Sequence, residues 1–204
     1  MISFLHTSEV HIERFENLVR KFNKDITTKH YVNSDILQYA LQNEKLDSEG
    51  FQQEIINIKK ENPELIICTC SSYGAVCNKI NNVKRIDYPI ADYLVTNYKK
   101  IGLVFTAKST ENVSRDLLKS IATHQKKEIE IINFDCSTAW VHFENDNIEA
   151  YELTIANKIK KNIHKVDVIF LAQASMEGAK KHLQHINKEV FSSPEFGIEN
   201  YLKA

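Results

Sequence analysis

A thiol and an amide follow the two most apolar segments of the chain. Cys70, with Ser71 and Ser72 behind it, ends the run ELIICT, and Gln173 ends VDVIFLA, with Ser175 two residues later. If each run is a strand that opens into a helix, N–H groups and the helix dipole stabilise a thiolate at Cys70. Such a thiolate can act as a nucleophile or as a general acid/base. A buried structural cysteine is the alternative interpretation.

Small uncharged donors mark two other segment ends. His6 and Thr7 close the apolar run at the start of the chain, and Thr106, Ser109 and Thr110 follow the run IGLVF. Hydroxyl groups and helix N-terminal N–H groups suit a carboxylate. A polyphosphate is not expected, because the chain has no Gly-rich loop and no GxxxxGKS/T motif.

The remaining cysteines and histidines give weaker signals. Cys68 is expected in the core, Cys77 on a helix packed against the sheet, and Cys136 in a loop that could approach the site. No metal site is expected, because Cys-x-Cys has no second pair at zinc spacing. His182 and His185 form an isolated pair on a Lys-rich segment. A serine hydrolase is not expected either, since no G-x-S-x-G motif is present.

Strands and helices alternate along the sequence. Apolar runs predict eight strands, at 2–7, 27–33, 65–71, 83–88, 101–106, 128–135, 168–174 and 189–193. Apolar residues at helical spacing predict helices at 10–22, 49–62, 110–125 and 148–164. This alternation is typical of an α/β protein with parallel sheets built from βαβ units.

The two halves of the chain repeat each other. The segment from Ile2 aligns with the segment from Ile101, and the segment from Leu65 aligns with that from Val168, at offsets of 99 and 103 residues. Cys70 then corresponds to Gln173. Coincidence is the alternative, because all βα units share an apolar run followed by small polar residues. Duplication predicts two similar Rossmann/flavodoxin-like α/β domains related by a pseudo-twofold, with the active site between them.

The domain boundaries follow from this repeat. The first domain is expected to comprise residues 1–97 plus 189–204 and to carry Cys70, and the second to comprise 98–188 and to carry Thr106 and Gln173. Ligands of open parallel sheets bind beyond the carboxyl ends of the strands, where these side chains are expected.

The composition excludes several classes of protein. Twenty-six Lys and Arg against 27 Asp and Glu give a net charge of −1, so no basic field for nucleic acid or anionic lipid is present. No apolar run is long enough to span a membrane, and MISFLHTSEV, which has no basic start and no cleavage site, is expected to form a first strand and not a signal peptide. Four cysteines without a disulfide framework favour reduced thiols and a cytoplasmic protein.

Five segments together resemble the aspartate/glutamate racemase superfamily, which also includes hydantoin racemase, maleate isomerase and arylmalonate decarboxylase. They are ICTCSSYG, RIDYPIAD, IGLVFTAKST, DVIFLAQASM and FSSPEFG, in the order of the family over nearly the whole chain. The resemblance implies two α/β domains with the active site between them. It also implies proton transfer at the carbon next to a carboxylate by one cysteine from each half, with no metal or pyridoxal cofactor.

Cys70 matches the first cysteine of this pattern, but Gln173 stands where the second would be. Glutamine has no titratable proton, so two-base racemisation is not expected. A single-thiol reaction stays open: proton transfer on one face, decarboxylation with reprotonation, or nucleophilic addition as in maleate isomerase. Gln173 is then expected to hydrogen-bond a carboxylate or carbonyl of the substrate. Arylmalonate decarboxylase also uses one cysteine, but from its second half. The resemblance implies carboxylate binding by Ser71, Ser72, Thr106, Thr110 and Ser175, with Ser109 competing with Thr110.

The leading hypothesis is therefore a cofactor-independent isomerase acting on a small carboxylate, an amino acid or a related acid, through Cys70. A lyase of the same superfamily and a carboxylate-binding protein without activity are the alternatives. A hydrolase using Cys70 and His6 is a weaker one, which requires the imidazole within hydrogen-bond reach of the sulfur. The resemblance also implies a homodimer.

Overall fold

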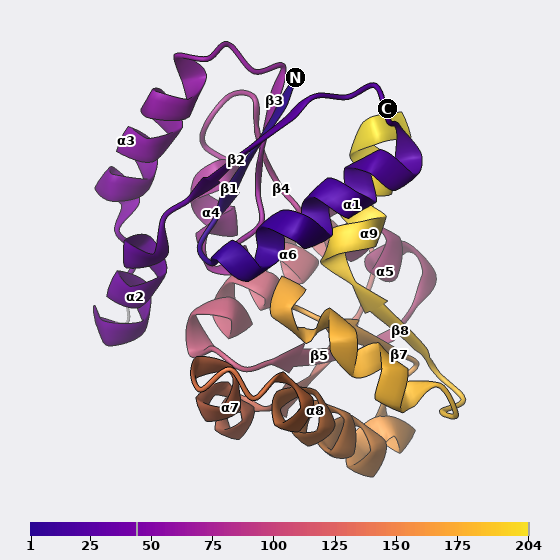
Figure 1. Ribbon diagram of the computed structural model, residues 1–204. Helices are drawn as coiled ribbons and strands as arrows, with labels where there is room; N and C mark the ends of the chain where they lie inside the picture. The colour runs from indigo at the N-terminus through magenta and orange to yellow at the C-terminus, as the bar shows by residue number, and fades with distance from the viewer. Residues whose placement is uncertain (44, 204) are drawn as a thin grey trace. The chain divides into compact units, whose positions relative to one another are not determined.

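The computed structural model describes residues 1–43 and 45–203, which fold into two compact units (Figure 1). The first unit comprises Met1–Tyr88 and the C-terminal segment from Pro194, and the second comprises Pro89–Ser193. Each unit contains a four-stranded parallel sheet flanked by helices. The expected α/β class with two similar halves is confirmed.

The sheet of the first unit has the strand order β2-β1-β3-β4. Its strands are β1 (Ile2–His6), β2 (Thr28–Val32), β3 (Leu65–Cys68) and β4 (Val83–Arg85). Its helices are η1 (Glu9–His11), α1 (Ile12–Phe22), α2 (Ser34–Asn43), α3 (Ser48–Lys59), η2 (Ser71–Tyr73), α4 (Gly74–Cys77) and α9 (Ser193–Lys203).

Successive residues of β1 point to opposite faces of this sheet, as the pleat requires. Leu5 packs in a core with Phe51 and Ile55 of α3, whereas Phe4 packs against Phe15 of α1, with ring centroids 5.5 Å apart and the rings tilted by 43°. Both side chains are fully buried. An apolar strand without polar alternation is therefore what this sheet needs.

The sheet of the second unit has the strand order β6-β5-β7-β8. Its strands are β5 (Lys100–Phe105), β6 (Glu130–Asp135), β7 (Val168–Leu171) and β8 (Glu189–Ser192). Its helices are α5 (Tyr88–Asn97), α6 (Lys108–Gln125), η3 (Ser137–Ala139), α7 (Trp140–Glu144), α8 (Ile148–Asn162), η4 (Ile163–Lys165) and η5 (Ala174–Leu183).

Helix α8 covers part of this second sheet. Tyr151, Ile155 and Ile159 of α8 are completely buried in one core with Val104 of β5. The helix begins at a local signal, because the side chain of Asn147 accepts a hydrogen bond from the Ala150 amide at 3.2 Å.

The predicted repeat is present in the register of the sheets. Ile2 pairs with Leu65 in the first unit, and Ile101 pairs with Val168 in the second. The Thr69 amide donates to the Leu5 carbonyl at 3.0 Å, and the equivalent residues of the second unit, Ala172 and Val104, form the same bond at 3.0 Å. The offsets of 99 and 103 residues read from the sequence are thus those of the structure.

The unit boundaries differ from the expected ones at residues 97 and 189. Strand β8 pairs in parallel with β7, from Val168 with Glu189 to Leu171 with Ser192, so it belongs to the second unit. Helix α5 also lies in the second unit. The sequence repeat aligned only the first and third strands of each unit. It therefore did not show to which sheet the fourth strand belongs.

A buried ion pair lies within the segment RIDYPIAD of the first unit and contacts the segment ICTCSSYG. Arg85 donates two hydrogen bonds to Asp87, at 2.6 and 2.9 Å, and the side chains are 4% and 0% exposed. Gly74 lies directly against the guanidinium, since a Cβ atom there would come within 2.3 Å of the guanidinium carbon. The glycine of SSYG thereby makes room for the arginine of RIDYP.

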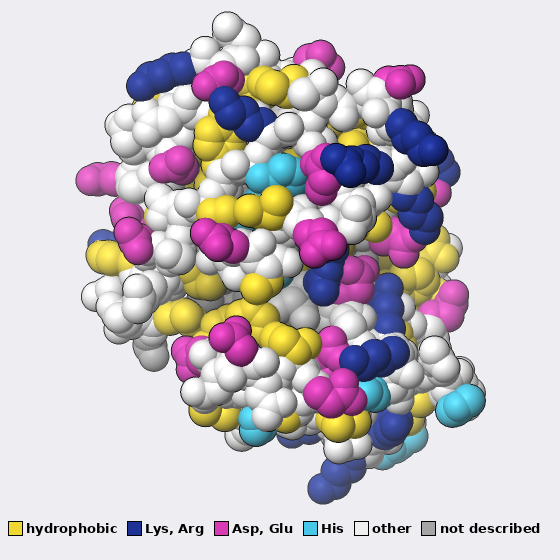
Figure 2. Space-filling model, in the orientation of Figure 1, with side chains coloured by type: hydrophobic (Ala, Val, Ile, Leu, Met, Phe, Trp, Pro, Cys, Tyr) yellow, Lys and Arg dark blue, Asp and Glu magenta, His cyan; other side chains and the backbone are white. Residues whose placement is uncertain are grey.

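The charged surface is mixed. Lys, Arg, Asp and Glu side chains are interspersed over the face drawn in Figure 2. Within the described part of the chain, no helix is both long enough and apolar enough to cross a membrane.

Candidate active site

Cys70 lies at the end of β3, where the chain turns into η2. Its backbone is extended, with φ −90° and ψ 110°, and it occupies the N-cap position of η2. The sulfur interacts with the Thr7 hydroxyl and with the backbone N–H groups of Ser72 and Tyr73, all of which lower the pKa of the thiol. The structure thus places Cys70 among the donors that the sequence predicted within this unit.

The thiol of Cys70 is nevertheless protonated at neutral pH. Burial, and next the neighbouring Cys68, raise the pKa of Cys70 to about 11. The expected stabilisation of a thiolate is outweighed, because burial disfavours the charged form more than the three hydrogen bonds favour it. In this state the thiol is a proton donor rather than a base.

The other cysteines lie in the two cores. Cys68 is 1% exposed, and its thiol donates to the Cys70 carbonyl at 3.6 Å. Cys77 of α4 is also 1% exposed, as expected for a helix residue packed on the sheet. Cys136 is buried in the core of the second unit, and burial raises its pKa to about 12. Cys136 lies in the loop after β6, as expected, but its side chain belongs to this core.

His6 forms a chain of polar contacts inside the first unit. Its Nδ1 lies 2.9 Å from Oγ1 of Thr69, and its Nε2 lies 2.8 Å from Nδ1 of His30. Nε2 of His30 in turn donates to the carboxylate of Glu16 at 3.1 Å. The two imidazole rings are nearly coplanar, with an interplanar angle of 8°. Both ring nitrogens of His6 are therefore occupied.

This arrangement corrects two expectations for His6. The side chain is 0% exposed, so it does not present itself to a ligand. Its nitrogens contact Thr69 and His30 rather than the sulfur of Cys70, so the pair that a thiol hydrolase requires is not formed. Burial, followed by the charges of His30 and His11, lowers the pKa of His6 to about 3. The neutral ring supports the end of β1.

Gln173 occupies the position equivalent to Cys70 in the second unit. Its backbone is extended and it is the N-cap residue of η5. Its side-chain oxygen accepts hydrogen bonds from the Thr106 amide at 2.7 Å, the Thr106 hydroxyl at 3.0 Å and the Ala107 amide at 3.2 Å. Two of these donors are N–H groups, so the atom they face is an acceptor oxygen.

These donors define an anion-binding position that Gln173 fills. Ala107 is the N-cap residue of α6, a helix of 18 residues that has no side-chain cap of its own. The free N–H groups at such a helix start favour negative charge. Thr106 therefore lies where the sequence predicted a carboxylate ligand, but the amide oxygen of Gln173 takes the place of that ligand. Gln173 was expected to contact a substrate instead.

Tyr151 extends this network and was missed by the sequence analysis. Its hydroxyl lies 2.9 Å from Oγ of Ser175 and 3.3 Å from Oγ1 of Thr106. In the sequence, Tyr151 belongs to the apolar face of the helix predicted at 148–164, because its spacing matches Ile155 and Ile159. The signal that could have indicated more is the phenol itself, since a buried tyrosine hydroxyl usually has a polar partner.

The remaining predicted hydroxyls lie at helix starts. Ser71 and Ser72 open η2 and are 5% and 2% exposed. Thr110, in the first turn of α6, is 2% exposed, whereas Ser109 beside it is half-buried. Within each unit, therefore, the predicted residues gather at the carboxyl ends of the central strands.

Each unit has a four-stranded parallel sheet with the same strand order and a polar side chain after the third strand. The chain is therefore an α/β protein with a duplicated domain. No protein-family model matches the chain, and no curated protein does. Solved structures share its fold. Picrophilus torridus aspartate racemase has a TM-score of 0.79 at 14% identity, covering 99% of this chain and 92% of its own.

Two other racemases have the same fold. A glutamate racemase from Bacillus anthracis has a TM-score of 0.75 at 13% identity, covering 100% of this chain and 80% of its own. Allantoin racemase from Klebsiella pneumoniae has a TM-score of 0.66 at 12% identity, covering 99% and 86%. In its fold the chain thus resembles the aspartate/glutamate and hydantoin-type racemases, as the five sequence segments predicted.

Proposed function

We propose that the chain is a cofactor-independent isomerase of the racemase superfamily that acts on a small carboxylate through the single thiol of Cys70. The observation that carries the proposal is the equivalence of two pairs, Cys70 with Thr7 and Gln173 with Thr106. In each, the residue after the third strand contacts the threonine after the first. The racemases with this fold support the class of reaction.

In this proposal Cys70 removes a proton from one substrate carbon and returns it on the same face to a different carbon, because one thiol alone cannot invert a single carbon. A thiol whose pKa is about 11 donates a proton readily only to a strong base such as a carbanion. To accept a proton it must first ionise, and a cationic α-ammonium group beside the sulfur would favour the thiolate. An amino acid is for this reason the first substrate class to test.

Each unit offers hydroxyl groups that can bind a carboxylate. Ser71 and Ser72 open the helix after Cys70, and Thr106, Thr110, Ser109 and Ser175 surround the strand ends of the second unit. For Thr106 to bind a carboxylate, the side chain of Gln173 must turn away from its three donors. Gln173 itself retains two N–H donors for a substrate oxygen. Neither His6 nor a metal has a role in the proposed reaction.

The test is replacement of the thiol. Wild type and Cys70→Ala are incubated in deuterated buffer with a panel of amino acids, hydroxy acids, malonates and maleate, and NMR follows deuterium at the reacting carbon. We expect incorporation or turnover by wild type and a loss of at least about 100-fold in Cys70→Ala. Cys136→Ala, which removes a thiol from the core of the second unit, is the matched control. Equal activity of wild type and Cys70→Ala would exclude the role of Cys70.

One observation favours a second candidate, a carboxylate-binding protein without catalysis. Gln173 is neutral and has no proton to transfer, and its oxygen already accepts hydrogen bonds from the Thr106 and Ala107 amides. A binding protein would show carboxylate-dependent stabilisation in a thermal-shift screen but no deuterium exchange with any compound. Exchange that depends on Cys70 decides for the isomerase.

A further inference from the structure

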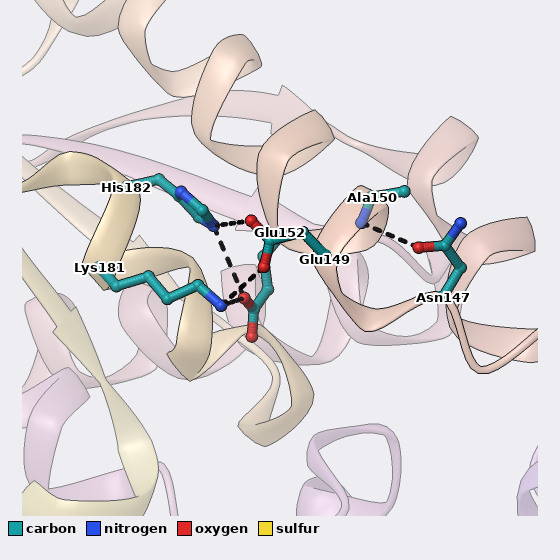
Figure 3. Close-up of polar contacts among 6 residues, drawn as sticks. All are labelled: Asn147, Glu149, Ala150, Glu152, Lys181 and His182. Carbon is teal, nitrogen blue, oxygen red and sulfur yellow. Dashed lines mark hydrogen bonds and ion pairs between the residues drawn. The ribbon is translucent and has the colours of Figure 1, made fainter.

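Two glutamates, a histidine and a lysine meet where α8 packs against η5 (Figure 3). Glu149 and Glu152 lie one turn apart on α8. The Nε2 atom of His182 lies 3.5 Å from a carboxylate oxygen of Glu149 and 3.7 Å from one of Glu152. Lys181 forms ion pairs with both glutamates, at 2.9 and 2.6 Å. All four residues belong to the second unit.

The inner part of this cluster is buried. Glu152 is 7% exposed at its side chain and His182 is 17% exposed. Oε2 of Glu152 and Nε2 of His182 are buried atoms that make no hydrogen bond of good geometry within the described residues, although Oε2 forms the ion pair with Lys181 at 2.6 Å. Gly178 of η5 lies against the same carboxylate, since a Cβ atom there would come within 1.8 Å of Oε1. The carboxylate is therefore held in place while one of its oxygens faces the imidazole.

The spacing of the three ligand atoms fits a small transition-metal ion. One atom each from Glu149, Glu152 and His182 lie within 4.8 Å of one another. Zinc bonds to nitrogen and oxygen of about 2.0–2.1 Å place neighbouring ligands of a tetrahedron about 3.4 Å apart. The two measured distances from the imidazole, 3.5 and 3.7 Å, are close to that separation and too long for hydrogen bonds.

The charges of this cluster also favour the binding of a divalent cation. Two carboxylates carry a charge of about −2, of which the single ammonium of Lys181 neutralises half. Lys181 is 52% exposed at its side chain, so it can move into solvent. A divalent ion in its place would neutralise both carboxylates and would use the unpaired nitrogen of His182.

We propose that Glu149, Glu152 and His182 bind Zn²⁺, in exchange with Lys181. No metal was expected from the sequence, because Cys-x-Cys has no second pair at zinc spacing and His182 and His185 form an isolated pair. The ligands instead come from an i,i+3 glutamate pair on α8 and a histidine 30 residues further along the chain. The bound ion would join α8 to η5, the segment that starts directly after Gln173.

The test is metal titration of the full chain after removal of adventitious metal with a chelator. Zn²⁺ binding is measured by calorimetry, and Co²⁺ replaces it for spectroscopy. We expect one equivalent of metal, a raised Tm, and visible d–d absorption of Co²⁺ without a sulfur-to-cobalt charge-transfer band. The missing charge-transfer band distinguishes this site from the four free cysteines.

Variants locate the site. Glu149 is 59% exposed, so Glu149→Gln keeps the fold, and we expect it to weaken binding by at least about tenfold. His182→Gln should do the same, whereas Lys181→Ala should strengthen binding because it removes the competing cation. His185→Gln, an exposed histidine of the same segment, is the matched control. No binding at millimolar Zn²⁺, or equal binding by wild type, Glu149→Gln and His182→Gln, would overturn the proposal.

Discussion

The side-chain oxygen of Gln173 accepts two hydrogen bonds from Thr106, one from its amide at 2.7 Å and one from its hydroxyl at 3.0 Å. With a third from the Ala107 amide at 3.2 Å, this oxygen occupies the two backbone N–H groups that directly precede α6. A neutral amide oxygen thus takes the place of an anion in front of the helix. This relationship determines what the second unit can bind and leads to the first prediction.

Gln173→Ala should destabilise the protein and make it responsive to carboxylates. Two buried N–H groups lose their acceptor, at about 1–3 kcal/mol of unfolding free energy. A small carboxylate such as malonate can replace the lost oxygen, so it should raise the Tm of Gln173→Ala more than that of wild type. Urea unfolding and thermal shift measure the two effects. Gln184→Ala, an exposed glutamine at the end of η5, is the control, and equal malonate shifts in all three proteins would contradict the prediction.

Gln173→Cys should restore a second thiol at the position equivalent to Cys70. If only that group is missing, the variant exchanges the proton next to the carboxylate of aspartate or glutamate with solvent, and optical rotation falls as the enantiomers equilibrate. The double variant Cys70→Ser/Gln173→Cys is the control, because it has one thiol in the opposite half. Racemisation by this control at the rate of Gln173→Cys would mean that Cys70 takes no part.

The strands and the repeat could be predicted from the sequence because they depend on local patterns. The eight apolar runs became the eight strands, and the alignment of Ile2 with Ile101 gave the register of the sheets. Helix α2, which buries only Ile36 and Ala40, gave too weak an apolar stripe to detect. The assignment of β8 to the second unit was not predicted, because strand pairing is a long-range contact that the sequence of one strand does not encode.

The chemical details of the candidate site were less predictable. The sequence placed Cys70 and Gln173 at equivalent strand ends, but it could not show that the oxygen of Gln173 turns inward to Thr106. The pKa of Cys70 also depends on burial, and the donors alone suggested the opposite direction. The contacts of Tyr151 and of the cluster around His182 could not be predicted, because the sequence does not show that α8 packs against η5. Such contacts join residues far apart in the chain.

The protein should lose stability on mild acidification, through His11. Burial, and next the charge of Arg14, lower the pKa of His11 from 6.5 to about 4. Between pH 6.5 and 4 the unfolded chain binds more protons at this residue than the folded chain, so stability is full above pH 6.5 and falls toward pH 4. At pH 5 the loss from this residue is about 2 kcal/mol.

His11→Phe tests this linkage with little other change. The Nδ1 atom of His11 is buried without a hydrogen-bond partner among the described residues, and its ring makes an edge contact with Phe15. Replacement by phenylalanine should leave the unfolding free energy at pH 7.5 within about 1 kcal/mol of wild type. At pH 5 the variant should be the more stable protein by about 2 kcal/mol. Parallel pH profiles of the two proteins in urea unfolding would show that His11 does not titrate as described.

The last prediction concerns the buried pair of Arg85 and Asp87 and the contact between Arg85 and Gly74. Arg85→Met should cost about 3–5 kcal/mol, because it leaves the carboxylate of Asp87 buried without its partner. The double variant Arg85→Met/Asp87→Leu should recover most of that loss, since no charge then stays buried.

Gly74→Ala is expected to be destabilising in wild type, where the new methyl group would come within 2.3 Å of the guanidinium carbon. In the Arg85→Met/Asp87→Leu background the rigid guanidinium is gone and a flexible thioether can move aside, so the same substitution should cost much less. The double-mutant cycle from urea unfolding should give a coupling of at least about 1 kcal/mol between Gly74 and the pair. Additive effects would instead mean that Gly74 is required by its own backbone and not by the arginine. Because Gly74 opens the helix directly behind the loop of Cys70, a coupled result would show that the core of the first unit determines the position of the candidate thiol.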